Sequence, residues 1–169
     1  NVATGMVIEG KAGFQIMGDW AKGEFTAAGK VPGVDYYCAA TPSNNGYLYN
    51  VDSFIFYKSS DPDKQAGQKL LAKLMMGKNF QKVFNLYKGS IPARLDVSMD
   101  EFDKCAKTSN ADIKTAGASG GLVPSFAHGM AQGNTMKAAL QDIITEHFNS
   151  DMSSVDAANA LADSVLANM

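Results

Sequence analysis

The second half of the sequence has the periodicity of apolar residues that is typical of amphipathic helices. Asp61 and Pro62 supply an N-cap and a proline at the first helical position of one helix. Its apolar residues recur at the spacing of one buried face: Ala66, Leu70, Leu71, Leu74 and Met75. A second helix is predicted over 79–87, with Phe80, Val83, Phe84 and Tyr87 turned inward.

Three more helices are predicted towards the end of the chain. Ser98 and Glu101 have the spacing of a capping box, which opens a helix through Phe102 and Cys105. A glycine-rich loop at 117–121 then leads into an extended segment at 122–124. A helix from about Asn134 buries Met136, Leu140, Ile143, Ile144 and Phe148. The last helix begins at Ser153 or Ser154 and presents Ala158, Leu161, Val165 and Leu166.

The first half of the sequence has the β-branched and aromatic runs that favour strands. Four strands are predicted, at 13–17, 34–40, 47–49 and 54–57. Asn44, Asn45 and Gly46 form a strong turn signal before the third strand. A short helix is predicted from Trp20, with Asp19 as its N-cap and Gly29 at its C-terminal end. Since strands cluster early and helices late, the predicted fold class is α/β or α+β.

Length and charge restrict the function classes. The 169 residues are enough for one domain with a real core, and 46% are hydrophobic and 19% charged. The net charge of -2 and the presence of only one arginine, Arg94, argue against nucleic acid as a partner. No apolar run approaches the roughly 18–20 residues of a membrane span. The chain opens at Asn1 without an initiator methionine or a signal region, which favours a piece of a larger protein.

The residues by themselves do not predict an enzyme, a metal site or a cofactor site. His128 and His147 lack the helical spacing and the cysteine neighbours of a zinc site. The 117–121 loop lacks the lysine and hydroxyl of a phosphate-binding loop. Cys38 and Cys105 are too far apart for a local metal knuckle, and two buried thiols and a disulfide explain them equally well. A disulfide here would stabilise the fold by roughly 4 kcal/mol and would persist in an oxidising compartment.

Longer strings resemble a known family. These are 14–25 (FQIMGDWAKGEF), 52–54 (DSF), 88–94 (KGSIPAR), 96–98 (DVS), 122–125 (LVPS), 127–130 (AHGM) and 148–154 (FNSDMSS). In this order and from end to end of the chain, they resemble the glucose/mannose-type periplasmic sugar-binding proteins of ABC importers, a group within the extracellular solute-binding proteins of family 1.

The resemblance implies a fold, a location and partners. The family fold has two α/β lobes of type II that close over a sugar in the cleft between them. Residues 1–169 resemble the C-terminal lobe, a small sheet flanked by helices, with 129–169 as a helical tail packing toward the lobe junction. The N-terminal lobe is absent from this chain. A periplasmic location, a monosaccharide ligand such as glucose, mannose or galactose, and membrane permease subunits as partners are therefore expected, without a cofactor.

The resemblance also implies the residues that face the sugar, which are Trp20, Asp52, Lys88 and His128. An indole covers the C–H face of a pyranose, and a carboxylate, an ammonium and an imidazole serve its hydroxyls. Taken singly, each residue also has a structural explanation, such as a lysine that complements a helix dipole.

Family likeness bears on other residues too. Arg94 and Asp19 are expected to anchor loops, and the family-like surroundings of Cys38 and Cys105 favour a disulfide between them.

Two other interpretations stay open at this point. The chain is a stable structural piece that binds nothing alone, or it is a carbohydrate-active enzyme. A glycosidase needs two carboxylates roughly 5–10 Å apart across the scissile bond. Asp52 is the only acid predicted to face the sugar, so a binding module without catalysis is favoured.

Overall fold

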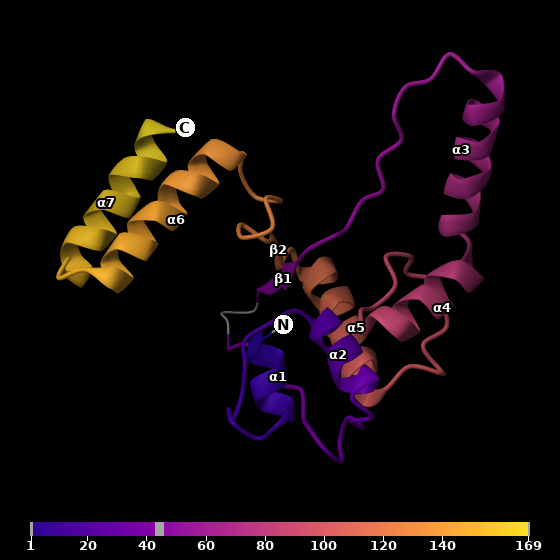
Figure 1. The fold of residues 1–169 in the computed structure, drawn as a ribbon, viewed down its shortest axis with the longest axis horizontal. Helices are drawn as coiled ribbons and strands as arrows, with labels where there is room; N and C mark the ends of the chain where they lie inside the picture. The colour runs from indigo at the N-terminus through magenta and orange to yellow at the C-terminus, as the bar shows by residue number, and fades with distance from the viewer. Residues whose placement is uncertain (1, 43–45, 169) are drawn as a thin grey trace. The chain divides into compact units, whose positions relative to one another are not determined.

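The computed structural model describes residues 2–42 and 46–168, and they form two compact units. Of the described residues, unit 1 comprises 2–42 and 51–121, and unit 2 comprises 46–50 and 122–168. Figure 1 shows the chain coloured from its N-terminus to its C-terminus.

Unit 1 is built from helices joined by irregular segments. Its elements are α1 (Val2–Ile8), the 3-10 helix η1 (Asp19–Ala21), α2 (Lys22–Ala27), α3 (Pro62–Met75), α4 (Lys78–Lys88) and α5 (Lys104–Ser119). The predicted start of α3 is confirmed, because the Asp61 carboxylate accepts hydrogen bonds from the N–H groups of Asp63 and Lys64. Gly29, at φ 71°, follows α2 as predicted.

Unit 2 combines a short parallel sheet with two helices. Strand β1 (Tyr47–Tyr49) pairs with β2 (Leu122–Pro124), and Tyr47 lies opposite Leu122. Helices α6 (Asn134–Asn149) and α7 (Ser154–Ala167) lie side by side (Figure 1). Ser153 caps α7, since its hydroxyl accepts a hydrogen bond from the Asp156 N–H. Both helices and β1 were predicted, and β2 lies where the sequence predicted an extended segment. The fold is a helix-rich α and β mixture with a two-stranded parallel sheet.

Three predicted strands are wrong. Residues 13–17, 34–40 and 54–57 form no strand, apart from an isolated bridge between Pro32 and Tyr36. The apolar side chains of these segments are exposed, as in Phe14 at 82% and Ile55 at 79%. Strand propensity needs a partner strand to take effect, and among the described residues none forms a strand alongside these segments. The turn predicted at Asn44 and Asn45 lies outside the described residues.

The predicted start and end of α5 are corrected as well. The Ser98 hydroxyl accepts a hydrogen bond from the Asp100 N–H within a turn, so Ser98 and Glu101 do not open the helix. Asp103 caps α5 instead, because its carboxylate accepts a hydrogen bond from the Ala106 N–H at 2.9 Å. The helix then continues through Gly117, which shortens the predicted glycine-rich loop, and Gly120 ends it at φ 72°.

The core is smaller than the periodicity predicts. Its buried apolar residues are Phe25, Met75, Val97, Phe102, Ala106 and Ala116 in unit 1, with Met136 and Ala157 in unit 2. Several side chains predicted to point inward are exposed, among them Leu70 at 71%, Tyr87 at 82% and Phe148 at 87%. A helical period fixes which residues share a face, but it does not supply the surface that covers that face.

Candidate functional site

The candidate site in unit 1 begins where the Gly18–Asp19–Trp20 turn approaches the end of α4. Asp19 does not cap a helix, contrary to the sequence prediction, because no side-chain cap bond forms at η1. Its carboxylate instead accepts a hydrogen bond from the Ile91 N–H at 3.0 Å. This bond joins residues 72 positions apart and gives Asp19 the loop-anchoring contact that the sequence indicated.

Two glycines allow α2 to lie directly against the end of α4. A Cβ at Gly23 would lie 2.8 Å from the Lys88 carbonyl oxygen, and one at Gly89 would lie 2.5 Å from the Gly23 nitrogen. Gly89 also has φ 88°, the left-handed conformation that ends α4. The backbone contact therefore brings the segment after Trp20 against Lys88.

Trp20 itself is half-buried and its ring lies over Gly18. A Cβ at Gly18 would lie 2.1 Å from the indole ring, so any side chain there would displace the ring. The structure thus gives this tryptophan a defined place beside the Asp19 anchor, with an aromatic surface that remains partly accessible.

Lys88 and Asp52 form an ion pair, with the Lys88 ammonium donating a hydrogen bond to the Asp52 carboxylate. The Asp52 side chain is 62% exposed and the Lys88 side chain 30%. The ammonium also lies 5.8 Å from the centroid of the Phe84 ring. One charged donor and one charged acceptor are therefore adjacent at a surface, where vicinal hydroxyl groups can bond to both.

The electrostatics of the site centre on Asp19. Burial raises the pKa of its carboxyl group, while the Ile91 hydrogen bond and the charges of Lys22 and Lys88 act in the opposite direction. Two lysines are therefore close enough to this carboxyl group to influence it electrostatically.

His128 belongs to unit 2, whereas Trp20, Asp52 and Lys88 belong to unit 1. It follows β2 and its Nδ1 atom lies 2.7 Å from the Ser125 hydroxyl, which is buried. The Ser125 N–H in turn donates to the Tyr49 carbonyl oxygen, which ties this loop to the sheet. The imidazole is thus held by a local hydrogen bond at the end of a strand.

Arg94 holds a loop beside the start of α4. Its guanidinium donates two hydrogen bonds of 2.8 Å to Asp96 and one of 3.1 Å to the Met76 carbonyl oxygen. The pKa of the Asp96 carboxyl group is lowered by Arg94 and Lys78. These contacts are those of the loop anchor that the sequence indicated.

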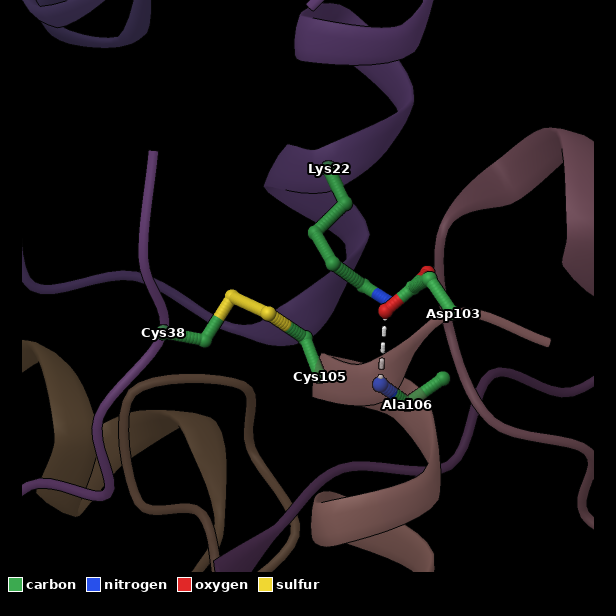
Figure 2. The surroundings of a disulfide bond; sticks show 5 residues. All are labelled: Lys22, Cys38, Asp103, Cys105 and Ala106. Atoms are coloured by element: carbon green, nitrogen blue, oxygen red, sulfur yellow. Dashed lines mark hydrogen bonds and ion pairs between the residues drawn. A yellow bond between two sulfur atoms is a disulfide. The ribbon is translucent and has the colours of Figure 1, made fainter. Parts of the chain in front are cut away.

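The disulfide is present between Cys38 and Cys105, with a Cα–Cα distance of 5.7 Å. A second link lies beside it (Figure 2), where the Lys22 ammonium pairs with the Asp103 carboxylate. The distance from Lys22 Nζ to Asp103 Oδ2 is 2.7 Å. Sequence reasoning did not single out Lys22 or Asp103. The available signals were that Lys22 lies in the family-like string after Trp20 and that Asp103 lies two residues before Cys105.

Comparisons with known proteins agree with the resemblance. No family model matches the chain. Over 166 residues, 98% of its length, it is 46% identical to a "Probable sugar-binding periplasmic protein" of Brucella suis biovar 1 and 44% identical to one of Rhizobium meliloti. It is also 36% identical over 145 residues to an uncharacterized ABC transporter extracellular-binding protein of Pyrococcus horikoshii. The similarity to periplasmic sugar-binding proteins is therefore confirmed.

The match covers most of this chain but only part of its relatives. The chain spans 39% of the length of the Brucella suis protein and 40% of the Rhizobium meliloti protein. Within the part of the chain that the structure describes, no helix has the length and apolar character needed to span a membrane. The names of these relatives state a periplasmic location. The periplasm is an oxidising compartment, in which a disulfide such as Cys38–Cys105 persists.

Proposed function

We propose that this chain supplies part of a monosaccharide-binding site in the periplasmic substrate-binding component of an ABC importer. The observation that carries the proposal is the Asp52–Lys88 ion pair, which lies on the same α4 end that α2 and the Trp20 turn contact. The 46% identity of this chain to a protein named as a probable sugar-binding periplasmic protein supports the proposal. In this role the protein binds and releases its ligand without catalysis.

The proposed contacts divide the work of recognising a pyranose. Trp20 covers the C–H face of the ring, and Asp52 accepts hydrogen bonds from adjacent hydroxyl groups. Lys88 donates to hydroxyl oxygens that a carboxylate cannot serve, and His128 donates or accepts according to its tautomer. A sugar with one inverted hydroxyl leaves one of these groups desolvated and unpaired, so the site discriminates between epimers.

The rest of the proposed site lies in the portion of the relatives that this chain does not match. In the proposal that portion forms the N-terminal lobe, the sugar binds in the cleft between lobes, and the closed form docks on membrane permease subunits. The chain covers 39% of the Brucella suis protein, which leaves enough sequence for such a lobe.

The first experiment uses Trp20 as the reporter, because it is the only tryptophan in the sequence. The chain is titrated with glucose, mannose and galactose while the tryptophan emission is recorded. A saturable change that prefers one sugar and is lost in Asp52→Ala supports a site in this chain. A flat response indicates that this portion alone is a structural piece.

A second experiment adds the portion that only the relatives have. The part of the Brucella suis relative that this chain does not match is joined to the chain, and sugar binding to the chimera is measured by calorimetry. Saturable binding that weakens in Asp52→Ala and Lys88→Met is expected. A folded chimera that binds none of the three sugars, or one whose affinity ignores both substitutions, contradicts the proposal.

A further inference from the structure

Lys22 is one of the most deeply buried charged residues described in this structure. Its residue exposure is 5% and its side-chain exposure 7%. Lysine is rarely buried to this extent unless its charge is paired, because removing an ammonium group from water is costly. The partner is Asp103, whose Oδ2 atom lies 2.7 Å from Lys22 Nζ.

Asp103 joins this ion pair to the start of α5 and to the disulfide. Its other oxygen accepts the hydrogen bond from the Ala106 N–H, and Cys105, two residues along, is bonded to Cys38. Burial raises the pKa of the Asp103 carboxyl group, but the hydrogen bonds from Lys22 and Ala106 outweigh it and the pKa is lowered. Asp103 is therefore ionised at neutral pH, as its pairing with Lys22 requires. Figure 2 shows these groups together.

The same lysine lies at the contact that assembles the candidate site. It is the second residue after Trp20, and a Cβ at Gly89 would lie 3.1 Å from the Lys22 Cβ. Gly89 directly follows Lys88, whose ammonium pairs with Asp52. One end of Lys22 thus lies against the Lys88–Gly89 turn, while its charged end is fixed to α5.

We propose that Lys22 and Asp103 are positioning residues for the sugar site. Their buried ion pair, tethered beside the Cys38–Cys105 disulfide, holds the start of α2 against the Lys88–Gly89 turn. It thereby sets the place of the Trp20 ring relative to the Lys88 ammonium. This inference rests on the proposed function for its effect on sugar affinity, but its effect on Trp20 is independent of any sugar.

The test neutralises the pair without removing the helix cap. Asp103→Asn keeps a side-chain oxygen for the Ala106 N–H and removes the charge that faces Lys22. The double variant Lys22→Met/Asp103→Asn removes both charges, so it leaves no unpaired buried ammonium if the single variant does not fold. In the sugar-free chain, both variants are expected to shift the Trp20 emission maximum and increase its quenching by acrylamide.

Sugar affinity is then measured by calorimetry on the Brucella chimera. The variants are expected to raise the Kd at least about tenfold, which corresponds to about 1.4 kcal/mol of binding free energy. The matched control is Lys82→Met, because Lys82 and Glu101 form an ion pair of the same 2.7 Å length at the surface of unit 1. It is expected to leave both the tryptophan emission and the Kd unchanged.

A second control separates positioning from general stability. Ala116 is buried, with 7% exposure, near the other end of α5. Ala116→Gly lowers the stability of the unit without changing either residue of the Lys22–Asp103 pair. It is expected to lower Tm and leave the Kd unchanged. Equal losses of affinity in Ala116→Gly and Asp103→Asn would overturn the proposal.

The two proposals fail in different ways. If the unmodified chimera binds no sugar, the proposed function fails, and the Trp20 quenching comparison still decides the positioning role. If the unmodified chimera binds sugar and the variants match it in Kd and in quenching, the positioning role is wrong and the sugar-binding function stands.

Discussion

At the scale of single residues, the contact between Gly23 and the Lys88 carbonyl determines how the candidate site is assembled. Gly23 lies within α2, so its backbone tolerates a side chain, and only the space beside it does not. An added Cβ would lie 2.8 Å from the Lys88 oxygen and 3.2 Å from the Tyr87 oxygen, so α2 would have to move away. We expect Gly23→Ala to lower the free energy of unfolding by about 1–3 kcal/mol, measured by chemical denaturation.

The control for this substitution is Gly67→Ala in α3. Gly67 is helical and has nothing within 4 Å of its added Cβ, so only helix propensity changes. This variant is expected to raise the free energy of unfolding by about 0.5–1 kcal/mol. If Gly23→Ala is stabilising to a similar extent, α2 and the end of α4 do not pack as closely as the structure shows.

The candidate site could be predicted from sequence only in part. Trp20, Asp52, Lys88 and His128 came from the family resemblance, since each taken alone has an ordinary structural explanation. The Lys22–Asp103 pair could not be predicted, because its two members lie 81 positions apart in the sequence and either would pass for an exposed charge. Pairings at that separation depend on tertiary packing, which the local pattern does not contain.

At the scale of elements, helices with local signals were predicted well and strands poorly. The starts of α3 and α7 depend on Asp61 and Ser153, whose hydrogen bonds span only two or three residues. The strand predicted at 54–57 depends on a remote partner, and the structure leaves Ile55 exposed. The start of α5 was misplaced because Ser98 and Asp103 both carry capping side chains, and the structure uses Asp103.

Asp103, the residue that caps α5, makes the stability of the fold depend on pH in the acidic range. The folded pKa of Asp103 is lowered from about 3.8, so the charged carboxylate contributes stability above that pH and the contribution is lost as the pH falls through the folded pKa. We expect the Tm of the chain to fall below about pH 3.8, and to fall less steeply in Asp103→Asn. Melting curves recorded from pH 6 to pH 2.5 measure the difference.

The contribution of Asp19 to stability depends on pH in the opposite direction, and the same melting curves test it. Its folded pKa is raised by burial, so its contribution is fully present below its unfolded pKa and is lost as the pH rises through the folded value. Asp19→Asn is therefore expected to make the acid loss steeper. If Tm falls with decreasing pH equally steeply in Asp103→Asn and in the unmodified chain, Lys22 does not hold the Asp103 carboxylate.

The disulfide links Cys105 of α5 to Cys38, which lies between α2 and β1 in the sequence. It joins residues 67 positions apart, and closing such a loop reduces the entropy of the unfolded chain. Reduction is expected to lower the free energy of unfolding by roughly 4 kcal/mol. Denaturation with and without dithiothreitol measures the change. The free energy of unfolding of Cys38→Ser/Cys105→Ser should be the same with and without dithiothreitol. Two alkylatable thiols in the unreduced chain would contradict the bond itself.

At the scale of the whole molecule, many apolar side chains lack a cover in the described structure. On α3, Leu70 is 71% and Leu74 59% exposed, and both line an apolar groove with Phe80 and Val83 of α4. Burying such residues stabilises a fold by about 1.5–3 kcal/mol each. This chain spans 39% of the length of its Brucella suis relative, and we expect the unmatched portion of that relative to cover this groove in the chimera.

The test compares the same substitutions in two contexts. Leu70→Glu/Leu74→Glu places charges at positions that are exposed in this chain, so its stability alone should change by less than about 1 kcal/mol. In the Brucella chimera the same change should lower the free energy of unfolding by several kcal/mol, because two charges would then be buried without partners. Lys69→Glu, also on α3 and exposed, serves as the control, and it should change the free energy of unfolding little in both contexts. Equal and small effects of the leucine substitutions in the two contexts would mean that the portion added in the chimera leaves α3 uncovered, and that the groove faces solvent there as well.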